Sequence, residues 1–388
     1  MSNDTQPEIR FPGFTEAWEQ RKLSDVASIV GGGTPSTSNP EYWDGDIDWY
    51  APAEIGDQIY VNKSLKTITE LGQQKSSAKI LPIGTVLFTS RAGIGNTAIL
   101  AKEGTTNQGF QSIVPHENKL DSYFIFSRTH ELKRYGEVTG AGSTFAEVSG
   151  KQMAKMPILI PYIDEQRKIG AFFGQIDEAI ALHQRKLDLL KETKKGFLQK
   201  MFPKNGAKVP EIRFPGFTEN WEEKKFKEVI NSGIKGKAKA EMSGTKSLYL
   251  DTNYLNGGVV TYVDSPRDVE NDDVLILWDG SQAGTVYYGF SGALGSTLKA
   301  YRAKESGAFL YQQLKRNQQI IYDRYRTPNI PHVVKTFTDE FMVSMPSSEE
   351  QFKIGTFFKQ LDDTIALQQR KLDLLKETKK GFLQKMFV

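Results

Sequence analysis

The stretch EQRKIGAFFGQIDEAIALHQRKLDLLKETKKGFLQKMF at Glu165–Phe202 decides the fold, because the chain repeats it as EQFKIGTFFKQLDDTIALQQRKLDLLKETKKGFLQKMF at Glu350–Phe387. The two copies are identical at 31 of 38 positions and lie 185 residues apart. A shorter pair, PEIRFPGFTEAW at Pro7–Trp18 and PEIRFPGFTENW at Pro210–Trp221, precedes a variable block in each half. Two copies are too few for a solenoid, so the sequence predicts two related halves and an internal pseudo-twofold repeat.

Apolar residues of the long repeat follow a heptad spacing, which predicts a coiled-coil helix about 50 Å long in each copy. The alternative is an ordinary amphipathic helix on a globular core. The predicted seam consists of Ile169, Phe173, Ile176, Ile180, Leu187, Leu190 and Phe197 in the first copy, and Ile354, Phe358, Leu361, Ile365, Leu372, Leu375 and Phe382 in the second.

Each helix is the obvious partner of the other, and pseudo-twofold symmetry favours an antiparallel pair. A register slipped by one heptad is the main alternative. His183 and Gln368 occupy seam positions and are interpreted as polar residues that set the register. The expected pairs are Phe173 with Phe382, Phe197 with Phe358, His183 with Leu372, and Leu187 with Gln368.

The blocks between the repeats read as short β-rich runs punctuated by Gly and Pro, which indicates strands joined by exposed loops. The predicted fold class is therefore α+β. Two globular domains with mixed, β-rich cores are separated by two long helices that form an antiparallel coiled coil. The predicted boundaries are 1–161 for the first domain, 162–204 for the first spacer helix, 205–346 for the second domain, and 347–388 for the second spacer helix.

Composition and motifs narrow the function classes. The 388 residues carry a formal charge of +3 and contain no cysteine, which excludes disulfides and thiolate metal sites. No apolar run is long enough for a membrane helix, so a cytoplasmic protein without a membrane partner is expected. The sequence has no GxxxxGK[ST], HExxH or GxSxG motif, and its four histidines are scattered. We therefore expect a binding protein without catalysis, metal or cofactor.

Small polar and basic side chains in the blocks are the candidates for DNA contacts, since such groups reach phosphates and base edges. The acid pairs Asp46/Asp48 and Asp272/Asp273 lie in turn-like sequence and are expected to be solvated. The candidates are Thr34, Ser36, Thr37, Arg91, Asn107, Gln108, Ser143 and Thr144 in the first block, and Lys235, Lys237, Lys239, Ser281, Gln282, Arg324, Arg326, Asn329 and His332 in the second.

Taken together, these stretches resemble the specificity subunit of type I restriction–modification systems over essentially the full chain. The duplicated order of variable block and conserved helix is the specific part of the resemblance. It is supported by RFPGF at Arg10–Phe14 and Arg213–Phe217, GGGTPST…YWDGDIDW at Gly31–Trp49, GTVLFTSRAGIG at Gly84–Gly95, IPYIDEQRKIGAFF at Ile160–Phe173, and QRKLDLLKETKKGFLQKMF in both copies.

The resemblance implies two target-recognition domains, each reading one half of a split, asymmetric double-stranded DNA sequence. It implies that the helices fix the half-site distance and dock two modification (methyltransferase) subunits, which carry S-adenosylmethionine and methylate adenine. Restriction (translocase/endonuclease) subunits, with ATP and Mg, would join that core, and this chain would be non-catalytic. The second block lacks the GGTP…YW signature, so the loop residues of the first block have no counterparts in the second. The alternative function is a coiled-coil scaffold whose variable domains bind protein or glycan ligands.

The twin short motifs are expected to be structural rather than ligand-binding, because they precede two divergent blocks almost unchanged. Their aromatic residues would anchor the first strand of each domain near the helix ends. These residues are Phe11, Phe14 and Trp18, with Phe214, Phe217 and Trp221 in the second copy.

Overall fold

The computed structural model describes residues 6–91, 93–141, 146–204 and 206–388. The chain divides into two compact units. Unit 1 comprises Met1–Leu182 and Leu372–Val388, and unit 2 comprises His183–Lys371. Each unit thus joins one variable block to parts of both long helices. These units cut across the predicted helical segments 162–204 and 347–388, because each block packs onto the helix ends beside it.

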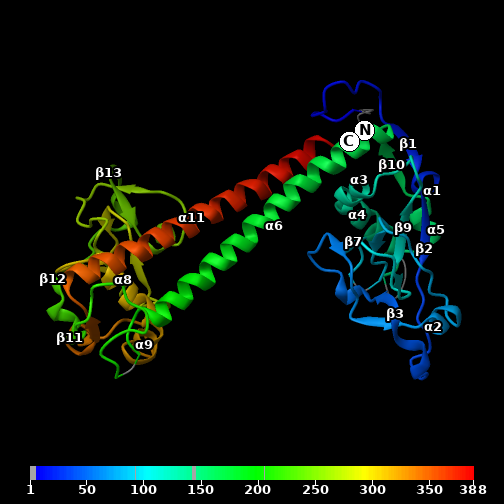
Figure 1. Cartoon of the computed structure of the whole chain (residues 1–388). Helices are drawn as coiled ribbons and strands as arrows, with labels where there is room; N and C mark the ends of the chain where they lie inside the picture. Colours follow the sequence, from blue (N-terminus) through cyan, green and yellow to red (C-terminus); the bar gives the residue numbers. More distant parts are fainter. Residues whose placement is uncertain (1–5, 92, 142–145, 205) are drawn as a thin grey trace. The chain divides into compact units, whose positions relative to one another are not determined.

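The long repeats form two helices of 38 residues each, α6 (Ile163–Lys200) and α11 (Ser348–Lys385), coloured green and orange to red in Figure 1. In unit 1 the beginning of α6 packs against the end of α11. The rings of Phe172 and Phe382 meet edge-on with centroids 5.0 Å apart, and Lys379 Nζ lies 2.6 Å from Asp177 Oδ1. The two segments therefore run antiparallel in this unit.

Unit 2 repeats this arrangement with the helix roles exchanged. The rings of Phe197 and Phe357 lie 5.1 Å apart, and Lys194 forms an ion pair with Asp362. His183 meets Gln368 through a side-chain hydrogen bond. The predicted antiparallel pairing is thus present within each unit, and every predicted seam residue is buried or half-buried.

The partners differ in detail from the expected pairs. The rings of Phe382 and Phe197 contact Phe172 and Phe357, the chain neighbours of the expected Phe173 and Phe358. Phe173 and Phe358 are fully buried in the cores of their own units, where they pack against Phe387 and Phe202. His183 contacts Gln368, one helical turn from the expected Leu372.

The block of unit 1 contains a five-stranded sheet in the order β2-β9-β6-β7-β4, a three-stranded sheet in the order β5-β3-β8, and the antiparallel pair β1-β10. The strands are β1 (Glu19–Lys22), β2 (Ala27–Gly31), β3 (Trp43–Tyr50), β4 (Tyr60–Val61), β5 (Lys66–Ile68), β6 (Val86–Phe88), β7 (Thr97–Leu100), β8 (Thr105–Thr106), β9 (Gln111–Pro115) and β10 (Pro157–Ile160). The helices are α1 (Leu23–Val26), α2 (Glu70–Gln74), α3 (Ser122–Ser127), α4 (Thr129–Gly140) and α5 (Gly150–Ala154).

The block of unit 2 contains a four-stranded sheet in the order β12-β18-β15-β16, a three-stranded sheet in the order β14-β13-β17, and the pair β11-β19. The strands are β11 (Glu222–Lys225), β12 (Ile230–Lys235), β13 (Ser243–Leu250), β14 (Tyr262–Val263), β15 (Val274–Leu277), β16 (Val286–Tyr288), β17 (Ala293–Leu294), β18 (Leu298–Ala303) and β19 (Met342–Met345). The helices are α7 (Thr252–Leu255), α8 (Gly307–Arg316), α9 (Gln318–Arg324) and α10 (Phe337–Glu340).

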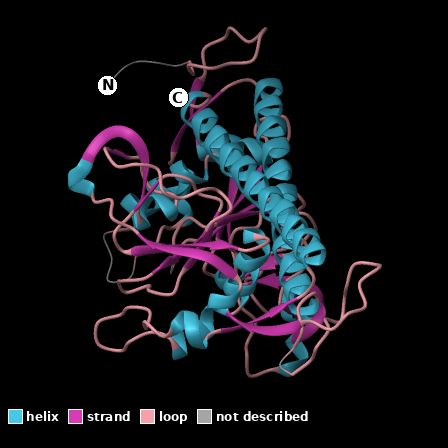
Figure 2. Cartoon of the chain, turned by 90° about the vertical axis from the view of Figure 1, so that its left-hand side faces the viewer, coloured by secondary structure: helices cyan, strands magenta, loops and turns pink. Residues whose placement is uncertain are grey.

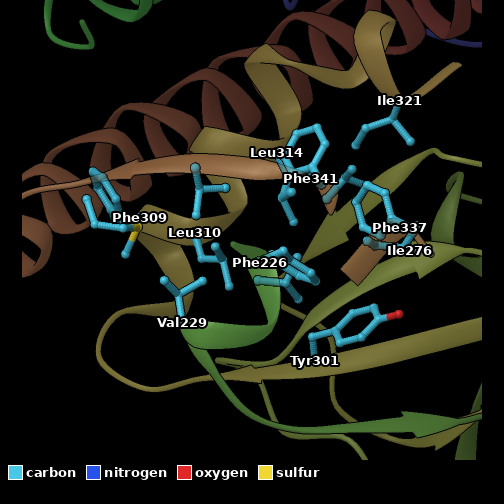
Figure 3. Packing of buried hydrophobic residues seen from close by; sticks show 14 of the residues in the cluster. Phe226, Val229, Ile276, Tyr301, Phe309, Leu310, Leu314, Ile321, Phe337 and Phe341 are labelled. Atoms are coloured by element: carbon cyan, nitrogen blue, oxygen red, sulfur yellow. The ribbon is translucent and has the colours of Figure 1, made fainter. Parts of the chain in front are cut away.

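The two blocks share one strand order despite their divergent sequences, and Figure 2 colours their strands and helices by type. The series β2-β9-β6-β7 of unit 1 corresponds to β12-β18-β15-β16 of unit 2, and β5-β3-β8 corresponds to β14-β13-β17. In unit 2 the central β15 is fully buried, and Ile276 packs with Phe226, Tyr301 and Phe337 in the core of Figure 3. The blocks are therefore two versions of one fold, and unit 1 adds β4 at the edge of its larger sheet.

The twin short motifs, residues 7–18 and 210–221, form what we call the first and second straps. Each strap fastens its block to a long helix through a buried ion pair. Arg10 Nε lies 2.6 Å from Glu165 Oε1, and Arg213 Nε lies 2.7 Å from Glu350 Oε1. Both glutamates belong to the first turn of a long helix and are almost completely buried.

Aromatic residues complete each strap in matching ways. Trp18 packs against Phe387 and Trp221 against Phe202, in each case beyond the end of a long helix. The Ile9 amide also donates to the Lys385 carbonyl at 2.9 Å, which satisfies one of the last carbonyls of α11. Strands β1 and β11 begin directly after the two tryptophans, so the straps seat the first strand of each block as expected.

Within the described residues, no helix combines the length and the apolar character that crossing a membrane requires. The same part of the chain contains no group of three or more acidic or histidine side chains placed to hold a metal ion.

Candidate nucleic-acid interface

In unit 1, the loop after β2 meets the loop between β8 and β9. The Thr34 hydroxyl donates a hydrogen bond to the Gln108 side-chain carbonyl, so two predicted residues lie in contact. Asn107 is next to them and is held in place twice: its amide donates to the Tyr50 carbonyl at 3.0 Å, and its Oδ1 accepts from the Gly109 amide at 2.8 Å. Thr34, Asn107 and Gln108 therefore form one polar surface.

The glycine run before Thr34 serves close backbone packing. A Cβ on Gly32 would lie 2.0 Å from the Asn107 carbonyl oxygen, and one on Gly33 would lie 2.5 Å from the Ala78 amide nitrogen. Only glycine allows the backbone to approach the β8–β9 loop and the segment after α2 this closely. The Trp49 indole also donates to the Gly33 carbonyl at 2.8 Å. The GGGT motif thus builds the loop on which the polar side chains stand.

Ser36 and Thr37 follow in an exposed turn beside this surface. The Ser36 and Ser38 hydroxyls lie 2.9 Å apart, and the Trp43 indole donates to the Ser36 carbonyl at 3.1 Å. Trp43 in turn packs edge-on against Trp49 with centroids 5.1 Å apart. The two tryptophans of the YWDGDIDW stretch therefore hold the backbone of the turn in place, and the turn itself is exposed.

The other candidates of the first block are separate from this surface or outside the described part of the chain. Arg91 forms an ion pair with Glu147 at 2.7 Å, and both side chains are substantially exposed. Ser143 and Thr144 lie outside the described residues. Within the part of the chain that the structure describes, no hydrogen bond or ion pair joins Arg91 to Thr34, Asn107 or Gln108.

The expectation that both acid pairs are solvated is wrong for one member of each. Asp48 is buried, accepts hydrogen bonds from the Ser64 amide and hydroxyl, and pairs with Lys102 at 2.9 Å. Burial acts to raise the pKa of Asp48, but the hydrogen bonds and the ammonium outweigh it, so the pKa lies below its usual value. Asp273 is likewise buried and pairs with Arg302 at 2.9 Å. Both acids therefore stabilise their own block.

In unit 2, the loop after β15 meets the segment that follows α9. Arg326 Nη1 donates to the Ser281 carbonyl at 3.1 Å, and Asp279 forms an isolated β-bridge with His332. His332 Nδ1 lies 3.0 Å from the Thr327 hydroxyl. Three predicted residues, Ser281, Arg326 and His332, are therefore brought together although Ser281 and Arg326 lie 45 residues apart in the sequence.

Lys235 joins this surface from the end of β12, where its Nζ lies 3.9 Å from an Asp279 carboxylate oxygen. Lys237 and Lys239 follow the strand and are exposed, and the Lys237 amide donates to the Leu294 carbonyl in the neighbouring sheet. The remaining predicted residues, Gln282, Arg324 and Asn329, are exposed. DNA contact by any of these residues stays a prediction.

Two residues at this surface, Lys299 and Trp278, were missed in the sequence. Lys299 on β18 lies directly opposite Lys235 in the strand register, and its Nζ stands 3.4 Å from the centre of the Trp278 ring. The alternation in LKAYRA at Leu298–Ala303 is typical of a half-buried strand and could have indicated that Lys299 shares a face with Tyr301. The opposite partner could not be read from the sequence, because register depends on the sheet.

Comparisons with known proteins agree with this architecture. The model of the type I restriction modification DNA specificity domain matches residues 15–192 and 218–377, one match for each half of the chain. The MjaIX type I restriction enzyme specificity subunit of Methanocaldococcus jannaschii is 35% identical over 178 residues, which cover 45% of this chain and 41% of that protein. The chain thus aligns with less than half of the length of this relative.

Longer but weaker similarities extend over the whole chain. The putative MjaX specificity subunit of the same organism is 23% identical over 414 residues, covering 95% of this chain and 92% of that protein. A crystal structure of the S subunit of a type I restriction–modification system from M. genitalium matches with a TM-score of 0.69 and 16% identity, over 99% of both chains. That structure supports the fold. Because the family model covers most of both halves, this chain belongs to the type I restriction modification DNA specificity domain family.

Proposed function

We propose that this chain is the sequence-reading subunit of a type I restriction–modification complex, in which each unit reads one half of a split, asymmetric duplex site. One observation carries the proposal: the two blocks share a strand order, but their candidate contact residues lie on different loops and differ in chemistry. Unit 1 presents Thr34, Asn107 and Gln108, whereas unit 2 presents Ser281, Arg326 and His332. Amide and hydroxyl groups favour different base edges from guanidinium groups, so the two units would read different half-sites.

The catalytic steps would belong to partner subunits. Modification subunits would bring S-adenosylmethionine and methylate adenine, and restriction subunits would bring ATP and Mg and cut DNA. This chain would itself be non-catalytic, hold no cofactor, and work in the cytoplasm beside the DNA. The family membership and the pairing of two unlike readers on one repeated helix support this division of labour.

The long helices supply a surface suited to two modification subunits. Leu182 and Leu189 on α6, and Leu367 and Leu374 on α11, are between 53% and 68% exposed. The two leucine pairs occupy equivalent positions of the long repeat, outside the buried seam. Leucines that recur at a heptad spacing are positioned to pack against a helix of a partner. The repeat offers this surface twice, once on each helix.

Selection of DNA by the complex tests the proposal. The full chain would be mixed with its modification subunit and a library of random duplexes, and bound duplexes would be sequenced. We expect a split motif with two unlike half-sites and an unread spacer of fixed length. A variant with Thr34→Ala and Gln108→Ala should lose preference in one half-site only. Stable assembly without any enriched sequence would instead favour the scaffold that binds protein or glycan.

A further inference from the structure

The two blocks differ sharply in charge at one equivalent position. In unit 1, Val86 of β6 pairs with Ile113 of β9, and Ile113 pairs with Ile29 of β2. In unit 2, Val274 of β15 pairs with Tyr301 of β18 in the same way. Because these strands correspond, the cross-strand pairs two residues further along β2 and β12 also correspond.

One cross-strand pair in each unit can therefore be compared for its charge. In unit 1 the pair is Gly31 opposite Gln111, and in unit 2 it is Lys235 opposite Lys299. One position of the shared sheet is therefore neutral in the first block and doubly cationic in the second. Like charges directly opposite each other on adjacent strands destabilise a sheet, so the lysine pair is not there for stability.

The surroundings hold Lys299 in place without neutralising it. Its Nζ lies over the ring of Trp278, which is itself buried beneath it. Burial lowers the pKa of Lys299, and Lys235 and Lys335 lower it further, while Asp279 acts in the opposite direction. Lys235 and Lys299 thus face each other across the two strands, with the Asp279 carboxylate beside Lys235. A neighbouring anion would relieve their repulsion.

The lysine pair also lies beside the loops that we expect to read bases. The Val333 amide donates to the Trp278 carbonyl at 2.9 Å, so Trp278 connects the pair to the segment that carries Arg326 and His332. Asp279, the next residue along the chain, forms the bridge with His332. A DNA strand whose bases reach this loop would bring its phosphates close to the two lysines.

We propose that Lys235 and Lys299 together bind a backbone phosphate of the half-site read by unit 2, and that unit 1 makes no ionic contact at the equivalent Gly31 and Gln111. The inference rests on the proposed DNA-reading function and deepens it. It assigns a contact to Lys299, and it makes the two half-sites unequal in their dependence on salt.

The substitution Lys299→Gln tests the inference, because it gives unit 2 the residue that unit 1 has at this position. The full chain, assembled with its modification subunit, would be titrated with its selected duplex at several salt concentrations. Each phosphate contact contributes about 0.9 to the slope of log affinity against log salt. We expect Lys299→Gln to reduce the slope by about that amount, so that the affinity lost between 50 and 200 mM salt shrinks about threefold.

Three further variants make the result specific. Lys235→Gln should reduce the slope similarly, and Lys299→Arg, which keeps the charge, should leave it near the wild-type value. Lys304→Gln makes the same change just beyond the far end of β18 and should leave the slope unchanged. Melting temperatures identify any variant that fails to fold.

The outcomes separate the inference from the function on which it rests. If the wild-type complex enriches no sequence, the DNA-reading function is wrong. If the wild-type complex binds its site and both glutamine variants keep its salt slope, the phosphate contact is wrong while the function stands.

Discussion

The ion pairs of the two straps allow a prediction about stability. Because the chain contains the same pair twice, the pair in one unit serves as the control for the other. In unit 2, Arg213 donates from Nε and Nη2 to the two oxygens of Glu350, both at 2.7 Å. The arginine side chain is 13% exposed and the glutamate side chain is fully buried. The substitution Arg213→Met would leave the Glu350 carboxylate in the interior without its partner. Breaking a buried pair in this way costs about 3–5 kcal/mol, so we expect unit 2 to lose about that much free energy of unfolding.

Hydrogen exchange at increasing urea concentration can follow the two units separately, which matters because a chain of two units need not unfold in one step. Arg213→Met should weaken protection in β11 and β19, whereas Arg10→Met should weaken it in β1 and β10. The double variant Arg213→Met/Glu350→Met should recover most of the loss, since replacing a whole buried pair by apolar side chains is often neutral. A loss below about 1 kcal/mol in both single variants, or an equal loss in both units, would refute this reasoning.

Three other predictions concern the block, the docking surface and the helix length. The lowered pKa of Asp48 means that its stabilising contribution is present above the ordinary carboxyl pKa and is lost as the pH falls through its folded value. Asp48→Asn should therefore destabilise unit 1 in urea melts at pH 7, by about 1–3 kcal/mol, and progressively less as the pH falls below the ordinary carboxyl pKa. The double variant Leu182→Asp/Leu367→Asp should bind the modification subunit at least about tenfold more weakly, as measured by calorimetry. An unchanged affinity would show that these leucines do not belong to the docking surface. Repeating residues 181–187 and 366–372 adds one heptad to each helix, or about 10 Å of length. Selection from duplexes of varied spacer length should then return half-sites about three base pairs further apart. Half-sites at the wild-type separation would argue against the helices as the spacer.

The heptad seam predicted the two long helices well, because apolar residues rarely keep a 3.5-residue spacing over so many turns outside a coiled coil. The seam could not predict that Phe172 and Phe357 pack edge-on against Phe382 and Phe197 of the opposite helix, while Phe173 and Phe358 are fully buried in the cores of their units. Each helix carries two adjacent phenylalanines there, and the packing of the block determines which neighbours each ring contacts. A helical pattern alone does not contain that information.

The candidate site was predicted in part, for related physical reasons. The sequence could indicate Ser281 and Arg326 as exposed polar residues, but their proximity depends on a loop contact between distant segments. Asp48 and Asp273 looked like turn residues, and only the structure shows the partners that make their burial possible. Lys299 was missed because its meaning comes from its cross-strand neighbour.

Genome-wide mapping of methylated adenines tests the central claim most directly. The measurement uses cells that carry this chain and its modification subunit, compared with cells that lack the chain. The account predicts one new methylated motif, asymmetric and split, with two short half-sites at a fixed separation. The absence of any methylation that depends on the chain, or a single undivided motif, would contradict a protein that reads DNA with two unlike units.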